Sequence, residues 1–297
     1  MNSYLNILKP NRLPYKLRRI GPNRDGSYIL PEDLEGIEAC FSPGTNNRKD
    51  FEDVLAIKYK IKSFMCDFSS DFDKFETALI KDMQFFEKKW LDINKSQDSI
   101  TLEKWVNSNV PNLDSDLLLQ MDIEGAEYRN LLAISDSLLK RFRILVIEFH
   151  NLTNLVKDKK NKSLENVLKK INKSHLCVHV HPNNCSKSEF LEIQTGMNIP
   201  DTIECTFLRK DRFLNKKILK EPDLPNINDI SNCKWQKPIH LNIKWRKSNK
   251  INFKSRLKII KDYHLWITTI LYGLVFKTNL FKLILKKLFN KILNINI

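Results

Sequence analysis

Short apolar runs alternate with polar, helix-forming stretches over the first two thirds of this chain. An apolar run at 37–42 is followed by a turn at 43–47 and by a helix predicted for 50–60, whose apolar positions recur at helical spacing. A second strand is predicted for 62–67 and ends in an acid. Alternation of this kind is typical of a Rossmann-like α/β fold, in which helices lie on both faces of a mainly parallel sheet.

The next stretch, 71–116, is mostly polar, and its apolar residues recur at helical spacing. We therefore expect it to be largely helical, with a further helix around 102–106. The positions that carry the first helical period are Phe75, Leu79, Met83 and Phe86.

The segment LLLQMDIEGAEYRNLL, residues 117–132, changes character in its middle. Its apolar start predicts a strand buried on both faces, and Asp122 and Glu124 follow where that strand should end. A helix face follows, and a further apolar strand then places Glu148 and His150 near its own end. Because the carboxyl ends of parallel strands meet at one sheet edge, we expect these acids and His150 to converge there.

Two late segments complete the predicted sheet. A helix is expected at 163–171, and HLCVHVH, residues 175–181, alternates strictly between polar and apolar positions. The alternation predicts that His175, Cys177, His179 and His181 share one face. Histidines at alternate positions can bind one metal ion, but a half-buried strand with a polar side explains the same pattern, so no metal ligand is assigned. A strand at 203–208 is expected to pair antiparallel near the sheet edge.

These patterns divide the chain into four parts. Residues 1–36 form a turn-rich segment, and 37–210 form the Rossmann-like domain. Residues 211–250 contain three prolines and little periodicity, which predicts a linker or a wrapping segment. Residues 251–297 are predicted to be a basic amphipathic helical tail.

Charge is concentrated in that tail. The chain carries a net charge of +15, and residues 250–297 hold ten Lys or Arg against one acid. The apolar run at 265–276 is too short to span a bilayer, whereas the segment after it places lysines opposite Leu and Ile. Such a helix suits an anionic membrane surface, although docking onto its own domain or a partner is an open alternative. An AT-rich genome would also raise the basicity without any selected partner.

The first predicted strand-turn-helix has the layout of a nucleotide-type site. Gly44 lies in the turn, and Asp67 ends the next strand 23 residues later, where a carboxylate can accept hydrogen bonds from ribose hydroxyls. The turn has one glycine and lacks the GxGxxG pattern of dinucleotide-binding folds.

The acids after residue 121 allow two interpretations. Asp122 and Glu124 could stabilise a helix N-terminus through its dipole, without any chemical role. Alternatively, the cluster of Asp122, Glu148 and His150 could position a hydroxyl nucleophile, accept its proton or bind a divalent cation.

Five motifs together resemble the FkbM-type S-adenosylmethionine-dependent methyltransferases. They are ACFSPGTNNRKDFE, SFMCDFSSD, LLLQMDIEGAEYRNLL, LVIEFH and the late HPNN with IECTFLR, and they cover roughly residues 18–209. The resemblance implies a seven-stranded Rossmann-like methyltransferase sheet and methyl transfer, usually to an oxygen and often in glycan or natural-product pathways. Pro43 departs from the family pattern in the cofactor turn.

The resemblance also implies roles for particular residues. Ser42 and Gly44 match the cofactor turn and Asp67 the ribose acid, whereas Asp122, Glu124, Gly125 and Glu127 match the central motif. We therefore take Ser42, Gly44, Asp67, Asp122 and Glu124 as candidate S-adenosylmethionine-binding residues. Asp122, His150 and Glu148 are the candidate catalytic residues, with a divalent cation as an open second cofactor.

These inferences give an expected function and setting. We expect O-methylation of a glycan or another small-molecule or lipid-linked acceptor, with nucleic acid an unlikely partner. The alternatives are a noncatalytic membrane-surface or nucleic-acid adaptor and a nicotinamide-dependent oxidoreductase. The six cysteines show no CxxC spacing and the N-terminus lacks a secretory signal, so we expect a cytoplasmic protein at the inner face of a membrane.

Overall fold

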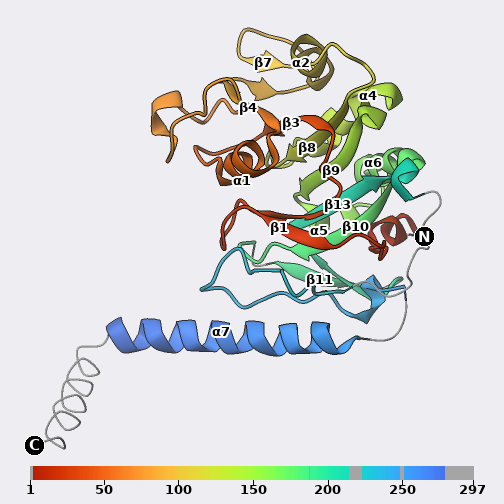
Figure 1. Ribbon diagram of the computed structural model, residues 1–297. Helices are drawn as coiled ribbons and strands as arrows, with labels where there is room; N and C mark the ends of the chain where they lie inside the picture. Colours follow the sequence, from red (N-terminus) through yellow and green to blue (C-terminus); the bar gives the residue numbers. More distant parts are fainter. Residues whose placement is uncertain (1–2, 187, 214–222, 248–250, 278–297) are drawn as a thin grey trace, which may run out of the picture.

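A seven-stranded sheet forms the centre of the molecule (Figure 1). The computed structural model describes residues 3–186, 188–213, 223–247 and 251–277. The strands lie in the order β10-β13-β9-β8-β3-β4-β5. Their bounds are Ile37–Pro43 for β3, Lys62–Cys66 for β4, Gln84–Glu87 for β5, Asp116–Met121 for β8, Phe142–Phe149 for β9, His175–Pro182 for β10 and Ile203–Arg209 for β13.

Six of these strands run in one direction. The pairs from β9 through β8, β3 and β4 to β5 are parallel, whereas β13 is antiparallel to both β9 and β10. The predicted Rossmann-like methyltransferase sheet is thereby confirmed. The reversed strand is β13, which lies between β9 and β10. The dinucleotide-binding sheet, with strand order 3-2-1-4-5-6, has no such reversed strand.

Helices cover both faces of the sheet, as predicted. The alternation along β8 explains the two layers, because Leu117 and Leu119 pack into one core and Leu118 into the other. The first core lies under α2 (Leu102–Asn109), α3 (Glu127–Ala133), α4 (Asp136–Arg141), α5 (Leu152–Lys157), α6 (Ser163–Ser174) and the 3-10 turn Ser3–Leu8. The second lies under α1 (Asp50–Val54), its π-helical continuation Leu55–Tyr59, and the hairpin of β1 (Leu17–Ile20) and β2 (Tyr28–Pro31).

Smaller elements complete the described chain. The segment 223–247 wraps the body and contributes Leu224, Leu241 and Trp245 to the first core. The remaining elements are β6 (Trp90–Leu91), β7 (Ser99–Ile100), the hairpin of β11 (Glu189–Glu192) and β12 (Met197–Pro200), and the 3-10 turns Phe72–Lys74, Lys210–Phe213 and Ile243–Trp245.

The helix expected within 71–116 on the Phe75 to Phe86 period is wrong. Gln84–Glu87 forms the edge strand β5, which pairs in parallel with β4, and Phe75 packs edge-on against Phe86 at 5.0 Å between ring centroids. Pairing with a neighbouring strand thus outweighs a weak helical period. The prediction failed because a local sequence pattern does not show which strands will be neighbours. The second expected helix is present as α2.

The single polar face predicted for 175–181 is also wrong. The register of β10 against β13 shifts between Cys177 and His179, so the strict alternation is broken there. As a result Cys177 packs with Val180 in the first core, and Val178 packs in the second. The strand is indeed antiparallel to β13, with β10 as the edge strand.

A buried ion pair fixes the wrapping segment to β10. Asp229 accepts hydrogen bonds from His179 Nε2 at 2.8 Å and from the Asn226 backbone N–H at 2.7 Å. His181 Nδ1 lies 3.7 Å from Oδ2 of Asp229, the oxygen that accepts from Asn226. Burial raises the pKa of Asp229, but the two histidines outweigh it and hold the pKa well below its usual range. For His181, burial lowers the pKa and Asp229 outweighs it, so the pKa is raised.

Asp229→Asn is expected to lower the free energy of unfolding by about 2 kcal/mol at pH 5.5, because charge-assisted hydrogen bonds are lost. Because its pKa is lowered in the folded state, Asp229 stabilises the fold at pH values above about 3.9, its pKa in the unfolded chain. Because its pKa is raised, His181 stabilises the fold at pH values below about 6.5, its pKa in the unfolded chain. The His181 contribution is lost as pH rises through its folded pKa. Urea unfolding of both proteins should therefore show a smaller difference at pH 9, and an equal difference would contradict this account.

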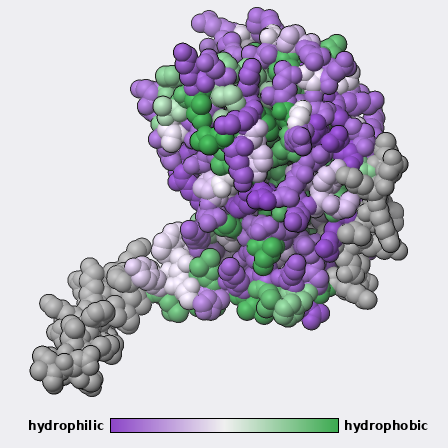
Figure 2. All heavy atoms as spheres, in the orientation of Figure 1, coloured by the Kyte–Doolittle hydropathy of each residue, from purple (hydrophilic) through white to green (hydrophobic). Residues whose placement is uncertain are grey.

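The long helix α7, Phe253–Lys277, lies along one side of the body, and its C-terminal part extends beyond it (Figure 1). Ser255 and Lys258 are buried, and Ser255 Oγ donates to the Pro225 carbonyl at 3.0 Å. Apolar residues line its outer side (Figure 2), namely Phe253, Leu257, Ile260, Ile267 and Leu271. Within the described ranges, no helix combines the length and apolar character that crossing a membrane requires. The lysine-rich part predicted after residue 277 lies outside the described residues.

Candidate active site

A cavity of about 800 Å³ opens at the carboxyl edge of the sheet. Its wall combines the residues that follow β3, β4 and β8, together with Trp90 and Leu91 of β6. The neighbours β3 and β8 are the place where the strand order reverses. Ligands of open α/β sheets bind at such a switch point, so this cavity is the candidate site.

Gly44 allows the ends of β3 and β8 to approach each other. Its φ is +86°, and a Cβ at this position would overlap the carbonyl oxygen of Asp122. The Gly44 N–H donates to the Cys66 carbonyl at 2.9 Å, and the Asp122 N–H donates to the Pro43 carbonyl at 3.2 Å. A glycine is therefore required here by both conformation and space.

Asp67 organises the cavity wall. One oxygen accepts from the Asn46 N–H at 2.8 Å, and the other accepts from the N–H and the hydroxyl of Ser69 at 2.8 and 2.6 Å. Burial raises the pKa of Asp67, but the interactions with Ser69, Asn46 and Ser70 outweigh it and lower the pKa. Because each carboxylate oxygen has two lone pairs, the oxygen facing Asn46 can accept one more hydrogen bond.

Two further residues line this side of the cavity, whereas the candidate Ser42 does not. Thr45 lines it, and its buried hydroxyl has no hydrogen-bond partner within the described chain. Trp90 is half exposed at the wall and stacks on Phe68 at 5.3 Å between ring centroids. Ser42 is fully buried, with its hydroxyl 3.4 Å from Cys40 Sγ, so the structure places this candidate beneath the wall.

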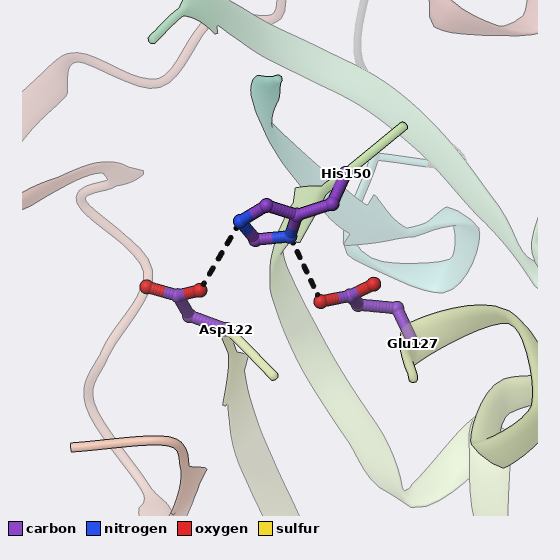
Figure 3. A group of neighbouring side chains, drawn as sticks. All are labelled: Asp122, Glu127 and His150. Carbon is purple, nitrogen blue, oxygen red and sulfur yellow. Dashed lines mark hydrogen bonds and ion pairs between the residues drawn. The ribbon is translucent and has the colours of Figure 1, made fainter. Parts of the chain in front are cut away.

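The candidate catalytic residues Asp122, Glu148 and His150 lie close together, as expected. The imidazole of His150 stands between two carboxylates (Figure 3), with Nδ1 3.0 Å from Glu127 and Nε2 3.7 Å from Asp122. The same Nε2 lies 3.5 Å from Glu124 and 4.0 Å from Glu148. Asp122 and Glu124 also line the cavity, whereas His150 is not among its lining residues.

Glu127 holds this arrangement in place, a function that sequence reasoning did not assign to it. Its side chain is fully buried, and one oxygen accepts from the N–H groups of Ile123 and Gly125 at 3.0 and 3.2 Å as well as from His150. The other oxygen has no hydrogen-bond partner among the described residues. The signal in the sequence was an acid at the first position of a predicted helix, which also fits simple helix capping.

Burial and mutual repulsion shift the pKa values of the cluster. Burial raises the pKa of Asp122 to about 7, partly offset by His150. Burial, followed by Asp122, also raises the pKa of Glu148. For His150, burial lowers the pKa, but Glu127 and the other acids outweigh it and raise it to about 9. Perturbed groups beside a cavity are typical of functional sites.

Negative charge dominates the cavity wall. Seven carboxylate side chains line it against three basic ones, and the basic set is Arg48, Lys89 and Arg129. Such a wall favours a ligand that carries positive charge.

Comparisons with known proteins do not identify a family. No family model matches the chain, and no curated protein matches it. The solved structures that are similar over part of it include two with fibrillarin in their titles. A fibrillarin/Nop5p complex aligns at 13% identity with a TM-score of 0.35, covering 68% of this chain and 98% of the fibrillarin complex chain. A Methanococcus jannaschii fibrillarin, titled as a pre-rRNA processing protein, aligns at 11% identity with a TM-score of 0.37, covering 66% and 83%.

These titles correct one expectation. We expected a small-molecule or glycan acceptor and considered nucleic acid an unlikely partner. One neighbour is titled as a complex with a protein, Nop5p, and the other as a pre-rRNA processing protein. The expected set of partners is therefore wrong as stated. Beyond this correction the likenesses are not used, and the activity must be argued from the site itself.

Proposed function

We propose that this chain is an S-adenosylmethionine-dependent methyltransferase of the FkbM type. The observation that carries the proposal is the acid-lined cavity at the β3/β8 switch point, where Gly44 meets Asp122 and Asp67 ends the neighbouring strand. S-adenosylmethionine carries a sulfonium and an ammonium group, which suit such a wall. A nicotinamide dinucleotide carries an anionic pyrophosphate, which this wall and a turn without GxGxxG do not favour.

The residues present fit this cofactor. The remaining lone pair of Asp67 can accept from a ribose hydroxyl, and the unpartnered hydroxyl of Thr45 offers a further polar contact. The exposed face of Trp90 suits a base ring. Asp122 and Glu124 supply negative charge near the cationic end. When bound, the cofactor supplies an electrophilic methyl group.

We assign the transfer to an acceptor oxygen, in keeping with the resemblance. Asp122 is the group placed to take the acceptor proton, because it lines the cavity and its raised pKa of about 7 suits proton transfer near neutral pH. His150 lies behind it and is held by Glu127. Orientation of the reactants can supply much of the rate enhancement for such a transfer.

Calorimetric titration of the full chain with S-adenosylmethionine, with NADH as the matched control, tests the proposal. Saturable binding of the former with one site per chain, and no binding of NADH, is the expected result. Binding of NADH alone would replace the proposal with the oxidoreductase alternative. Binding of neither ligand by protein shown to be folded would leave the adaptor alternative.

We also propose that the protein associates peripherally with a membrane through α7. The support is the stripe of five exposed apolar residues on its outer side, spaced three, four or seven residues apart, with exposed basic residues such as Lys254 and Lys261 beside it. Such a helix can bury its apolar side at the headgroup boundary while lysines contact anionic lipid.

The double variant Ile260→Glu/Ile267→Glu is expected to lose most binding to anionic liposomes in a sedimentation assay, because it places charge on the apolar stripe. The matched control is Ser108→Glu/Ser137→Glu, which adds the same two charges at exposed positions of α2 and α4, away from α7 (Figure 1), and should bind much better than the stripe variant. Point variants are preferable to removal of α7, since Ser255 and Lys258 are buried against the body. Equal liposome binding by the two variants would contradict the proposal.

A further inference from the structure

The Nε2 atom of His150 faces three carboxylate oxygens without making a hydrogen bond to any of them. They belong to Glu124, Asp122 and Glu148, at 3.5, 3.7 and 4.0 Å. These distances are too long for N–H···O hydrogen bonds, which are about 2.7–3.2 Å. Two ligands that each lie about 2.1 Å from one metal ion are separated by roughly 3 to 4.2 Å, and the observed distances lie in that range.

The charge of the cluster is also unbalanced. Four carboxylates surround one imidazole, and those of Glu127 and Glu148 are buried. Within the described residues, His150 is the cation that pairs with them. When all four carboxylates are ionised, a protonated His150 balances only one of them, and the ionised form of the cluster is costly without a further positive partner.

We propose that His150 Nε2, Asp122 and Glu148 bind a divalent cation, with the exposed carboxylate of Glu124, 3.5 Å from Nε2, as a further candidate ligand on the cavity side. Figure 3 shows why Glu127 is not a ligand of the same ion, since the imidazole ring stands between it and Asp122. Glu127 is instead the outer carboxylate that receives the Nδ1 proton and orients the ring, as is common for metal-binding histidines. A mixed imidazole and carboxylate set suits Mn²⁺, Fe²⁺ or Zn²⁺.

The chemistry of this inference rests on the proposed function. In a methyltransferase, a cation in this site would define the kind of acceptor. Held by His150, Asp122 and Glu148, a divalent ion would polarise an acceptor hydroxyl and lower its pKa. In the transfer, the acceptor hydroxyl would give up its proton to a carboxylate at the cavity wall, its oxygen would bond to the methyl carbon, and the broken carbon–sulfur bond would leave S-adenosylhomocysteine. The acceptor class is therefore a hydroxyl compound that can bind a metal ion.

Binding of Mn²⁺ to the EDTA-treated full chain, followed by the electron paramagnetic resonance signal of the free ion, tests the site without any acceptor. One saturable Mn²⁺ per chain is expected, with affinity at least tenfold weaker in Asp122→Asn and in His150→Gln. Glu127→Gln should weaken it about 10- to 100-fold although it is not a ligand. The matched control is Asp92→Asn, a cavity-wall acid paired with Arg129, which should bind as the unaltered protein does.

A second measurement needs no variant and covers the case in which the substitutions prevent folding. Mn²⁺ should selectively broaden the ring signals of one of the six histidines in the NMR spectrum. Absence of saturable Mn²⁺ and Zn²⁺ binding, or unchanged binding in folded Asp122→Asn and His150→Gln, would overturn the site. S-adenosylmethionine binding is titrated separately without metal, so metal binding without cofactor binding would overturn the methyltransferase proposal and leave the cation site standing.

Discussion

Gly44→Ala is expected to lower the free energy of unfolding by about 3 kcal/mol and to abolish S-adenosylmethionine binding. A φ of +86° costs a residue with a Cβ about 1–2 kcal/mol, and overpacking adds about 1–3 kcal/mol. The added Cβ would overlap the Asp122 carbonyl oxygen, and Ile123 lies within 3.2 Å. The ends of β3 and β8 must therefore separate, which displaces Asp122 from the cavity wall.

Gly36→Ala is the matched control, because Gly36 has nearly the same conformation without the crowding. Its φ is +79°, and its nearest neighbour would be Arg143 Nη2 at 3.5 Å, an ordinary contact. We expect a loss of about 1 kcal/mol in urea unfolding and unchanged cofactor binding by calorimetry. If both alanine variants bound the cofactor equally, the close approach of β3 and β8 would not matter for the site.

The sequence predicted those site residues that stand at or directly after the end of a strand. Asp67 and Asp122 directly follow apolar runs, and parallel strands must end at a common edge. Glu148 and His150 come to the same edge for the same reason. The sheet itself was predictable because its central strands are uninterrupted apolar runs, buried on both faces.

What the sequence did not predict depends on contacts between distant segments. The edge strand β5 has a polar, mixed pattern and gains its structure from pairing with β4. The register shift in β10 lies between Cys177 and His179, so these two side chains do not follow the strict alternation. No local sequence pattern shows that such a shift will occur. The orienting contact of Glu127 arises across 23 residues from the close packing of α3 and β9. Ser42 was placed in the cofactor turn by resemblance, but its side chain faces inward.

Asp67→Ala is expected to weaken S-adenosylmethionine binding about 100-fold, which corresponds to about 2.7 kcal/mol. A hydrogen bond from a ribose hydroxyl to a carboxylate contributes about 1.5–3 kcal/mol. The substitution also releases the N–H groups of Asn46 and Ser69, which shape the wall around the ligand. Calorimetry on folded protein, with Asp114→Asn, an exposed acid outside the cavity, as the control, measures the change.

Asp67→Asn distinguishes a ligand contact from a purely structural function. An asparagine keeps one oxygen, but its NH₂ group must face either the Asn46 or the Ser69 N–H, both of which are donors. We therefore expect it to bind the cofactor nearly as weakly as Asp67→Ala. Because hydrogen bonds lower the pKa of Asp67, the carboxylate stays ionised at and above its usual pKa of about 3.9, and wild-type affinity should not change between pH 6 and 8 through this group. Binding of either variant within threefold of wild type would show that Asp67 orders the loop without contacting the cofactor.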